Sequence, residues 1–335
     1  MDWVEVVGYQ HEVVHTGVLR WALRAEPSSD RPHRLLQAMG VDAVQVDGDT
    51  VATEGRLTAA RRGPGKADLV ADITLAGGAR SRLAVETKVD SRATFDQLQA
   101  TMDDIAHRGV LLAVGLTGLQ FDPRSLPSER WRFVDVRRWQ QALAEAGVLP
   151  ELGPYADAIA AEVRRQEDAR ATARRCEDVL PDLDGDGGSR RIDGGTFVAW
   201  AWLAETRDQL QGQPAPWHGQ TERSGPVIWS APPKWKQADT GVDVYLSLTV
   251  EQRTPKLAVR VGGGRHLSDE MRVLAGGLAD GLDDLGFARP KRALSRGRGT
   301  YAAATLNLLG RPPAAAAIEI IRTIERLDRI AGSGS

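Results

Sequence analysis

Two carboxylates and a lysine lie within apolar, strand-like runs in the first third of the chain. Asp68 belongs to the run 67–70, and Glu86 and Lys88 belong to the run 83–89. Charged groups in a half-buried strand cost free energy unless they have a partner or bind a cation. Carboxylate oxygens suit Mg²⁺, and a lysine offsets negative charge that develops on a phosphate. The set therefore predicts metal-dependent hydrolysis of a phosphodiester.

The spacing of Glu86 and Lys88 indicates that they share one site. Side chains alternate between the two faces of a strand, so these two residues point the same way. If the strand that carries Asp68 pairs beside theirs, Asp68 and Glu86 converge on one ion, and Lys88 orients the attacking water or offsets charge. The alternative is an ordinary ion pair on a solvated strand face.

The order of these residues along the chain resembles the PD-(D/E)XK nuclease superfamily, within it the restriction-type and phage-defence-type nucleases. The matching set is Glu12 on the first helix, Asp68 on the second strand, Glu86 and Lys88 on the third, and Gln97 on the next helix. The resemblance implies an α/β fold with a restriction-endonuclease-like mixed sheet flanked by helices. It also implies Mg²⁺ dependence with Mn²⁺ as a substitute, an auxiliary role for Gln97, and cleavage of DNA.

Three positions differ from the pattern of that superfamily. Ala67 replaces a proline that is not a ligand, and Thr101 stands where related nucleases often place a tyrosine after the glutamine. Asp72 lies on the same strand face as Asp68 and competes with it for the motif. We assign the motif to Asp68 because it follows directly on a glycine-containing turn.

Hydrophobic spacing and turn residues predict the elements that would position this set. The order is helix, three strands in a meander, helix and strand, with a further strand and helix within 131–147. The ranges are helices 9–23 and 33–39, strands 51–59, 67–75 and 82–89, a helix 96–107 capped by Thr94, and a strand 109–115.

The length of 335 residues predicts two domains. We expect a nuclease domain over 1–150, a connecting helix and linker over 151–193, and a smaller α+β recognition or assembly domain over 194–331. Alternating charge within 155–180 predicts an exposed connecting helix. The expected elements of the second domain are helices 197–210, 268–285 and 314–330 and strands 227–230, 242–250, 256–261 and 301–309.

Composition restricts the class of protein. Hydrophobic residues make up 42% and charged residues 26% of the chain, which is typical of globular proteins. No apolar stretch approaches the roughly 18 residues of a membrane span, and the N-terminus shows no secretory signal. We therefore expect a cytoplasmic protein that does not associate with membranes. One cysteine excludes a disulfide framework within the chain.

The net charge of −2 gives no overall attraction to nucleic acid, so a basic footprint would have to be local. We predict such a footprint in one segment rich in glycine and proline, together with a stacking surface of tryptophans in proline-bounded loops. The alternatives are solvated loops and core packing. The predicted nucleic-acid-binding residues are Arg289, Lys291, Arg292, Arg296, Arg298, Trp217 and Trp235, with Trp229 in the same tryptophan-rich region.

The sequence thus predicts a metal-dependent endonuclease that acts on DNA in restriction or anti-phage defence. The resemblance leads us to expect a homodimer and is compatible with a partner subunit of a defence system. The alternative is a non-catalytic DNA-binding or subunit-docking protein that retains the nuclease fold. RNA and modified DNA are alternative substrates, between which the motifs do not choose.

Overall fold

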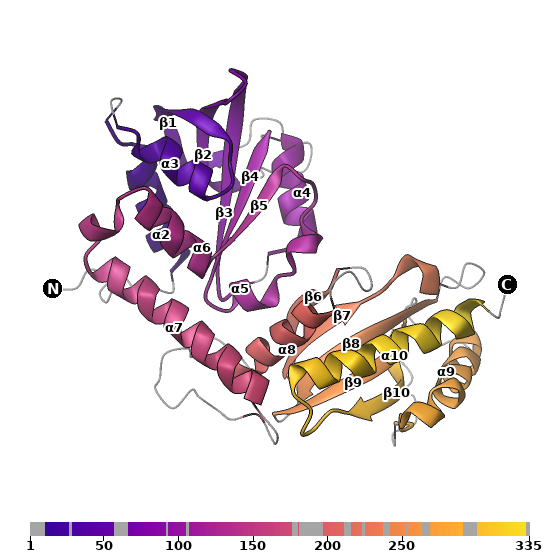
Figure 1. Cartoon of the computed structure of the whole chain (residues 1–335). Helices are drawn as coiled ribbons and strands as arrows, with labels where there is room; N and C mark the ends of the chain where they lie inside the picture. The colour runs from indigo at the N-terminus through magenta and orange to yellow at the C-terminus, as the bar shows by residue number, and fades with distance from the viewer. Residues whose placement is uncertain are drawn as a thin grey trace. The chain divides into compact units, whose positions relative to one another are not determined.

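The computed structural model divides the chain into two compact units, residues 1–166 and 167–335 (Figure 1). The division falls inside helix α7 (Pro154–Arg175), whereas the sequence suggested a separate connector over 151–193. The structure describes residues 11–26, 29–56, 66–91, 93–104, 107–175, 180, 197–210, 216–222, 225–236, 242–251, 253–262, 269–290 and 300–332.

The first unit contains a five-stranded mixed sheet of order β1-β2-β3-β4-β5. The first three strands form an antiparallel meander, and β3, β4 and β5 run parallel. This confirms an α/β fold with a mixed sheet. The first strand begins eight residues before the predicted position. The sequence did not reveal this early part because it contains several polar residues. The bounds are β1 (Ala43–Arg56), β2 (Lys66–Leu75), β3 (Arg80–Val89), β4 (Arg108–Val114) and β5 (Trp131–Asp135).

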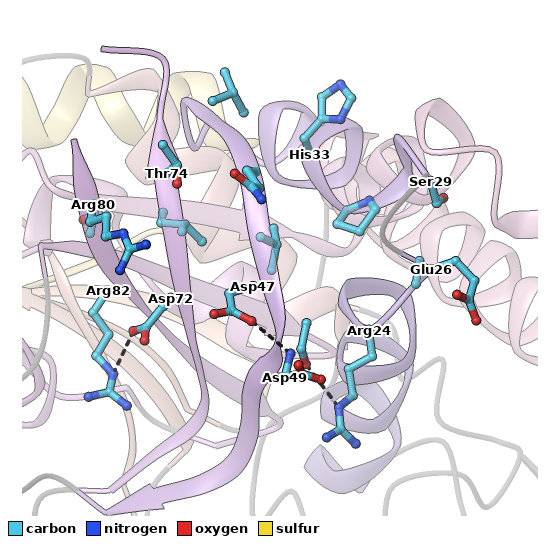
Figure 2. A pocket seen from close by; sticks show the side chains of 18 of the residues that line it. Arg24, Glu26, Ser29, His33, Asp47, Asp49, Asp72, Thr74, Arg80 and Arg82 are labelled. Atoms are coloured by element: carbon cyan, nitrogen blue, oxygen red, sulfur yellow. Dashed lines mark hydrogen bonds and ion pairs between the residues drawn. The ribbon is translucent and has the colours of Figure 1, made fainter. Parts of the chain in front are cut away.

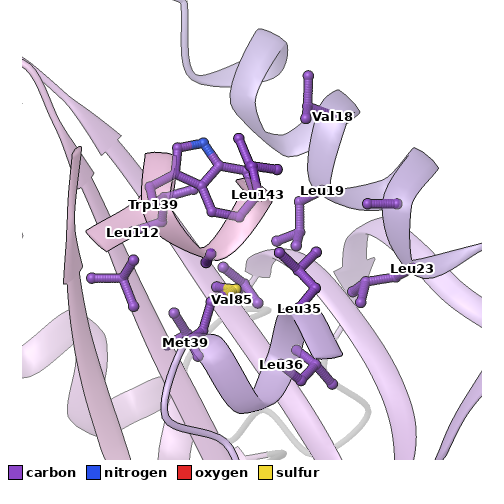
Figure 3. Packing of buried hydrophobic residues seen from close by; sticks show 14 of the residues in the cluster. Val18, Leu19, Leu23, Leu35, Leu36, Met39, Val85, Leu112, Trp139 and Leu143 are labelled. Atoms are coloured by element: carbon purple, nitrogen blue, oxygen red, sulfur yellow. The ribbon is translucent and has the colours of Figure 1, made fainter. Parts of the chain in front are cut away.

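Helices cover both faces of this sheet (Figure 1). On one face α2, α3, α6 and the start of α7 enclose the main core, in which Leu19, Val85 and Trp139 are buried (Figure 3). On the other face α4 covers a smaller cluster that contains Ala84 and Leu98. The bounds are α2 (Glu12–Leu23), α3 (Arg31–Ala38), α4 (Phe95–Asp104), α5 (Thr117–Gln120), η1 (Pro123–Ser125), α6 (Val136–Glu145) and η2 (Leu149–Glu151).

Strand β3 is central and is buried on both faces from Leu83 to Val89. Val85 and Val89 enter the main core, so the intervening Glu86 and Lys88 lie on the α4 face. Two charged side chains are therefore held inside the fold and not on a solvated strand face.

Helix α7 is not the exposed connector that its alternating charge suggested. Tyr155 and Ile159 are fully buried in the first unit, and Ala169 and Ala173 are fully buried in the second. Residues four apart lie on the same face of a helix, so a narrow apolar stripe packs while most of the charged residues, Glu162 excepted, cover the remaining surface.

The second unit contains a five-stranded antiparallel sheet of order β10-β9-β8-β7-β6, together with helices. Every element predicted there is present, and the short edge strand β6 (His218–Glu222) is additional. The other bounds are α8 (Phe197–Gln209), β7 (Gly225–Ser230), η3 (Pro233–Trp235), β8 (Asp243–Glu251), β9 (Thr254–Gly262), α9 (Asp269–Gly281), η4 (Asp283–Leu285), β10 (Thr300–Asn307) and α10 (Pro313–Gly332).

Across both units, none of the helices that the structure describes is long and apolar enough to cross a lipid bilayer.

Candidate active site

Asp68 and Glu86 lie side by side where β2 and β3 meet. The register that pairs Leu69 with Val85 places Asp68 opposite Glu86. The Asp68 carboxylate accepts a hydrogen bond from the backbone N–H of Thr87 at 2.7 Å, which fixes it against β3. The strand pairing thus brings together two carboxylates that are 18 positions apart in the sequence.

Lys88 completes this group on the same face of β3. Its Nζ lies 2.5 Å from Glu86 Oε1 and 3.9 Å from Glu12 Oε1. The side chains of Lys88 and Glu86 are 10% and 2% exposed, respectively, so this ion pair is almost removed from water. Low dielectric strengthens the attraction between the two charges, but each charge is also costly to bury.

Gln97 reaches the group from helix α4. Its side-chain amide donates a hydrogen bond to Glu86 Oε1. Thr94 Oγ1 accepts the backbone N–H of Gln97 at 3.2 Å, so Thr94 caps α4 as predicted. Thr101 donates to the carbonyl oxygen of Gln97 at 3.0 Å and therefore binds the helix itself.

Glu12 approaches from the first turn of α2, at the end of β3. Its Oε1 accepts hydrogen bonds from Ser91 Oγ at 2.7 Å and from the backbone N–H of Val89 at 3.4 Å. The Glu12 side chain is 37% exposed, in contrast to the 2% of the Glu86 side chain. All five predicted catalytic residues are thus brought to one place.

The electrostatics of the group follow from its burial. Burial, and then the charge of Asp68, raise the pKa of Glu86 from its ordinary 4.5 to about 7, although Lys88 acts in the opposite direction. Burial favours the neutral form of Lys88, but the negative charges of Glu86, Asp68 and Glu12 outweigh it and raise the pKa of this lysine. The group carries more negative charge than Lys88 alone compensates.

One carboxylate oxygen of the group lacks a hydrogen-bond partner, and a cation would fit it. Glu86 Oε2 is buried and has no hydrogen-bond partner. Within the described ranges no three His, Cys, Asp or Glu side chains are grouped to enclose a metal. Mg²⁺ commonly takes one or two carboxylates and completes its shell with water and substrate oxygens. The donor set of Asp68 and Glu86 fits that mode of binding.

Asp72, the competing candidate, lies away from this group. It pairs across the sheet with Arg82, its carboxylate is 3.5 Å from the Arg82 guanidinium, and its side chain is 52% exposed. It lines a cavity of about 1000 Å³ with Arg24 and Asp47, and this cavity contains both acidic and basic side chains (Figure 2). Asp68, Glu86 and Lys88 do not line that cavity.

The predicted nucleic-acid-binding residues divide into three groups. Trp217 and Trp235 are core residues, with 0% and 2% of their surface exposed, so the prediction that they stack on bases is wrong. The indole of Trp235 donates to Asp328 Oδ1 at 2.7 Å. Arg289 is exposed and pairs with Asp280. The remaining predicted residues, Lys291, Arg292, Arg296 and Arg298, lie outside the described residues.

Sequence analysis missed the polar residues that support the group. Ser91 binds Glu12, and its backbone N–H donates to Thr117 Oγ1 at 3.1 Å. Thr16 of α2 donates to Thr87 Oγ1 at 3.2 Å and joins the helix to β3. The only signal in the sequence was that Thr87 and Ser91 lie close to the charged pair. Threonine and serine are too common for such proximity to indicate a role.

No family model, curated protein or solved structure matches the chain.

Proposed function

We propose that the protein is a metal-dependent endonuclease that hydrolyses phosphodiester bonds of DNA. The observation that carries the proposal is the buried Glu86 carboxylate, which lies beside Asp68 and Lys88 and has one oxygen without a partner. A second carboxylate beside Glu86 makes its ionised form more costly, because like charges repel, and a divalent cation would offset that repulsion.

We further propose that the first unit has the restriction-endonuclease-like fold. In support, an antiparallel meander continues into parallel strands, and the acidic residues lie on its second and third strands. The order of Glu12, Asp68, Glu86, Lys88 and Gln97 along these elements follows the PD-(D/E)XK pattern. That pattern is also our reason for proposing a role in restriction or anti-phage defence.

Each residue has a distinct task in the proposed reaction. Asp68 and Glu86 would hold the ion, which when bound would polarise the scissile phosphate and promote ionisation of water. Lys88 orients the attacking water and offsets charge on the phosphate as it grows. Glu12 keeps Lys88 charged and close to the end of β3, and Gln97 fixes the orientation of the Glu86 carboxylate.

Cleavage of supercoiled plasmid DNA in Mg²⁺ tests the proposal. We expect Glu86→Gln and Lys88→Met to lose at least about 100-fold in rate, because each removes a group that acts on the developing charge. Asp72→Asn is the matched control, since it changes an aspartate on the same strand outside the group. Cleavage by both variants at the rate of the wild type would refute the assignment of these residues.

A non-catalytic protein that retains the nuclease fold is the second candidate. The observation in its favour is that Lys88 and Gln97 both bond Glu86 Oε1, which gives the pair a stabilising role without substrate. Such a protein would bind DNA but leave the plasmid supercoiled under every divalent cation tested.

A further inference from the structure

The two faces of the sheet in the second unit differ in chemistry. Cross-strand partners lie on the same face, so Ile228, Leu248 and Leu257 form one buried apolar row. Helices α8 and α9 contact the strands, and α10 packs on both helices (Figure 1). Successive side chains of a strand point to opposite faces, so the neighbouring cross-strand row points to the other face. This row consists of His218, Trp229 and Ser247.

Aromatic rings form a line across three strands on this opposite face. The ring centroids of His218 on β6 and Trp229 on β7 are 4.7 Å apart. Trp229 meets Tyr245 on β8 edge-on, with 6.3 Å between centroids. Trp229 and Tyr245 are both partly exposed, in contrast to the buried Trp217 and Trp235.

A cation lies next to the aromatic line. Arg260 on β9 is the cross-strand partner of Tyr245, and its Nε donates to Ser247 Oγ at 2.9 Å. This hydrogen bond holds the guanidinium on the aromatic face. Lys256 precedes Arg260 by four residues on β9 and is therefore on the same face. Its side chain is 41% exposed, and its Nζ lies 2.8 Å from Glu251 Oε2.

We infer that this aromatic face, defined by His218, Trp229, Tyr245 and Arg260, binds single-stranded DNA. Unpaired bases expose ring faces that stack on aromatic side chains, and the backbone phosphates complement a neighbouring arginine. In duplex DNA the ring faces are hidden, so the face distinguishes unpaired strands. The choice of DNA over RNA rests on the proposed function, whereas the stacking itself does not.

Fluorescence anisotropy with a labelled mixed-sequence oligonucleotide of about 12 nucleotides tests the inference. EDTA in the buffer prevents hydrolysis, so binding is measured separately from cleavage. We expect Trp229→Ala, Tyr245→Ala and Arg260→Ala each to weaken binding by about 10-fold. Trp229→Phe and Tyr245→Phe keep a ring and should stay within about 3-fold of the wild type.

The matched controls are Trp21→Ala, an exposed tryptophan of the first unit, and Arg329→Ala, an exposed arginine of α10. Neither should change the affinity. Equal losses in the alanine variants and these controls, or equal losses in the alanine and phenylalanine variants, would overturn the inference. So would an equal or higher affinity for the duplex or for RNA of the same sequence. Binding of the oligonucleotide without any cleavage of plasmid DNA in Mg²⁺ would refute the proposed function and leave the stacking of unpaired bases on this face intact.

Discussion

At the scale of single residues, the buried pair of Glu86 and Lys88 determines the properties of the candidate site. The sequence located this pair because a Glu and a Lys two positions apart share a strand face. The hydrogen bond from Gln97 and the contact between Glu12 and Lys88 depend on how α4 and α2 pack, so the sequence could suggest these residues but not their contacts. The burial of Trp217 and Trp235 was also invisible, because core and surface tryptophans look alike in a sequence.

The stability of the protein should depend on pH through Glu86. Its pKa is about 7 in the folded chain against an ordinary 4.5, so between these values the unfolded chain loses a proton that the folded chain keeps. The contribution of Glu86 to stability therefore falls as pH rises through this window. Glu86→Gln lacks the titration, and its stability relative to the wild type should rise by up to about 3 kcal/mol across the window.

Chemical denaturation at several pH values measures this difference when a spectroscopic signal of the first unit is used to monitor unfolding. Asp72→Asn is again the control, because it removes a half-exposed carboxylate from the same strand outside the group. A difference between Glu86→Gln and the wild type that does not change from about pH 4 to about pH 8 would show that Glu86 titrates normally.

At the scale of elements, the sequence predicted the strands and helices well wherever hydrophobic periodicity was strong. The two strands that carry Asp68, Glu86 and Lys88 were predicted to within two residues at each end, since each combines an apolar run with turn residues at its ends. The prediction of α7 as exposed failed because charges outnumber the small apolar residues of its buried stripe. Strand β6 was missed because a short edge strand with a glycine has little periodicity.

Strand β4 contains a position at which packing tolerates no side chain. A Cβ on Gly109 would lie 2.5 Å from the Trp131 ring on the neighbouring strand β5. We expect Gly109→Ala to lower the free energy of unfolding by about 1–3 kcal/mol, because the buried indole would have to move. Thermal unfolding checks this, with Gly77→Ala as the control, since Gly77 lies in a turn with no atom near its added Cβ. Equal melting temperatures for the two variants would contradict the packing argument.

At the scale of the whole molecule, the two units carry separate chemistries. The first unit contains the acidic group around Lys88, and the second contains the aromatic face around Trp229. The sequence predicted two domains and a recognition role for the second. Of the tryptophans it named for that role, Trp217 and Trp235 lie in the core, whereas Trp229 is partly exposed. Only the cross-strand register separates Trp229, which faces outward from the sheet, from the tryptophans in the core.

Titration calorimetry with Mn²⁺ on the full chain, at about pH 8 where Glu86 is ionised, tests the central claim most directly. The account predicts binding to the wild type and to Asp72→Asn, loss of that binding in Asp68→Asn, and a lower affinity at about pH 6, where protons compete for Glu86. Binding of equal strength in Asp68→Asn and the wild type, or no binding to the wild type, would contradict the claim that Asp68 and Glu86 converge on one divalent ion.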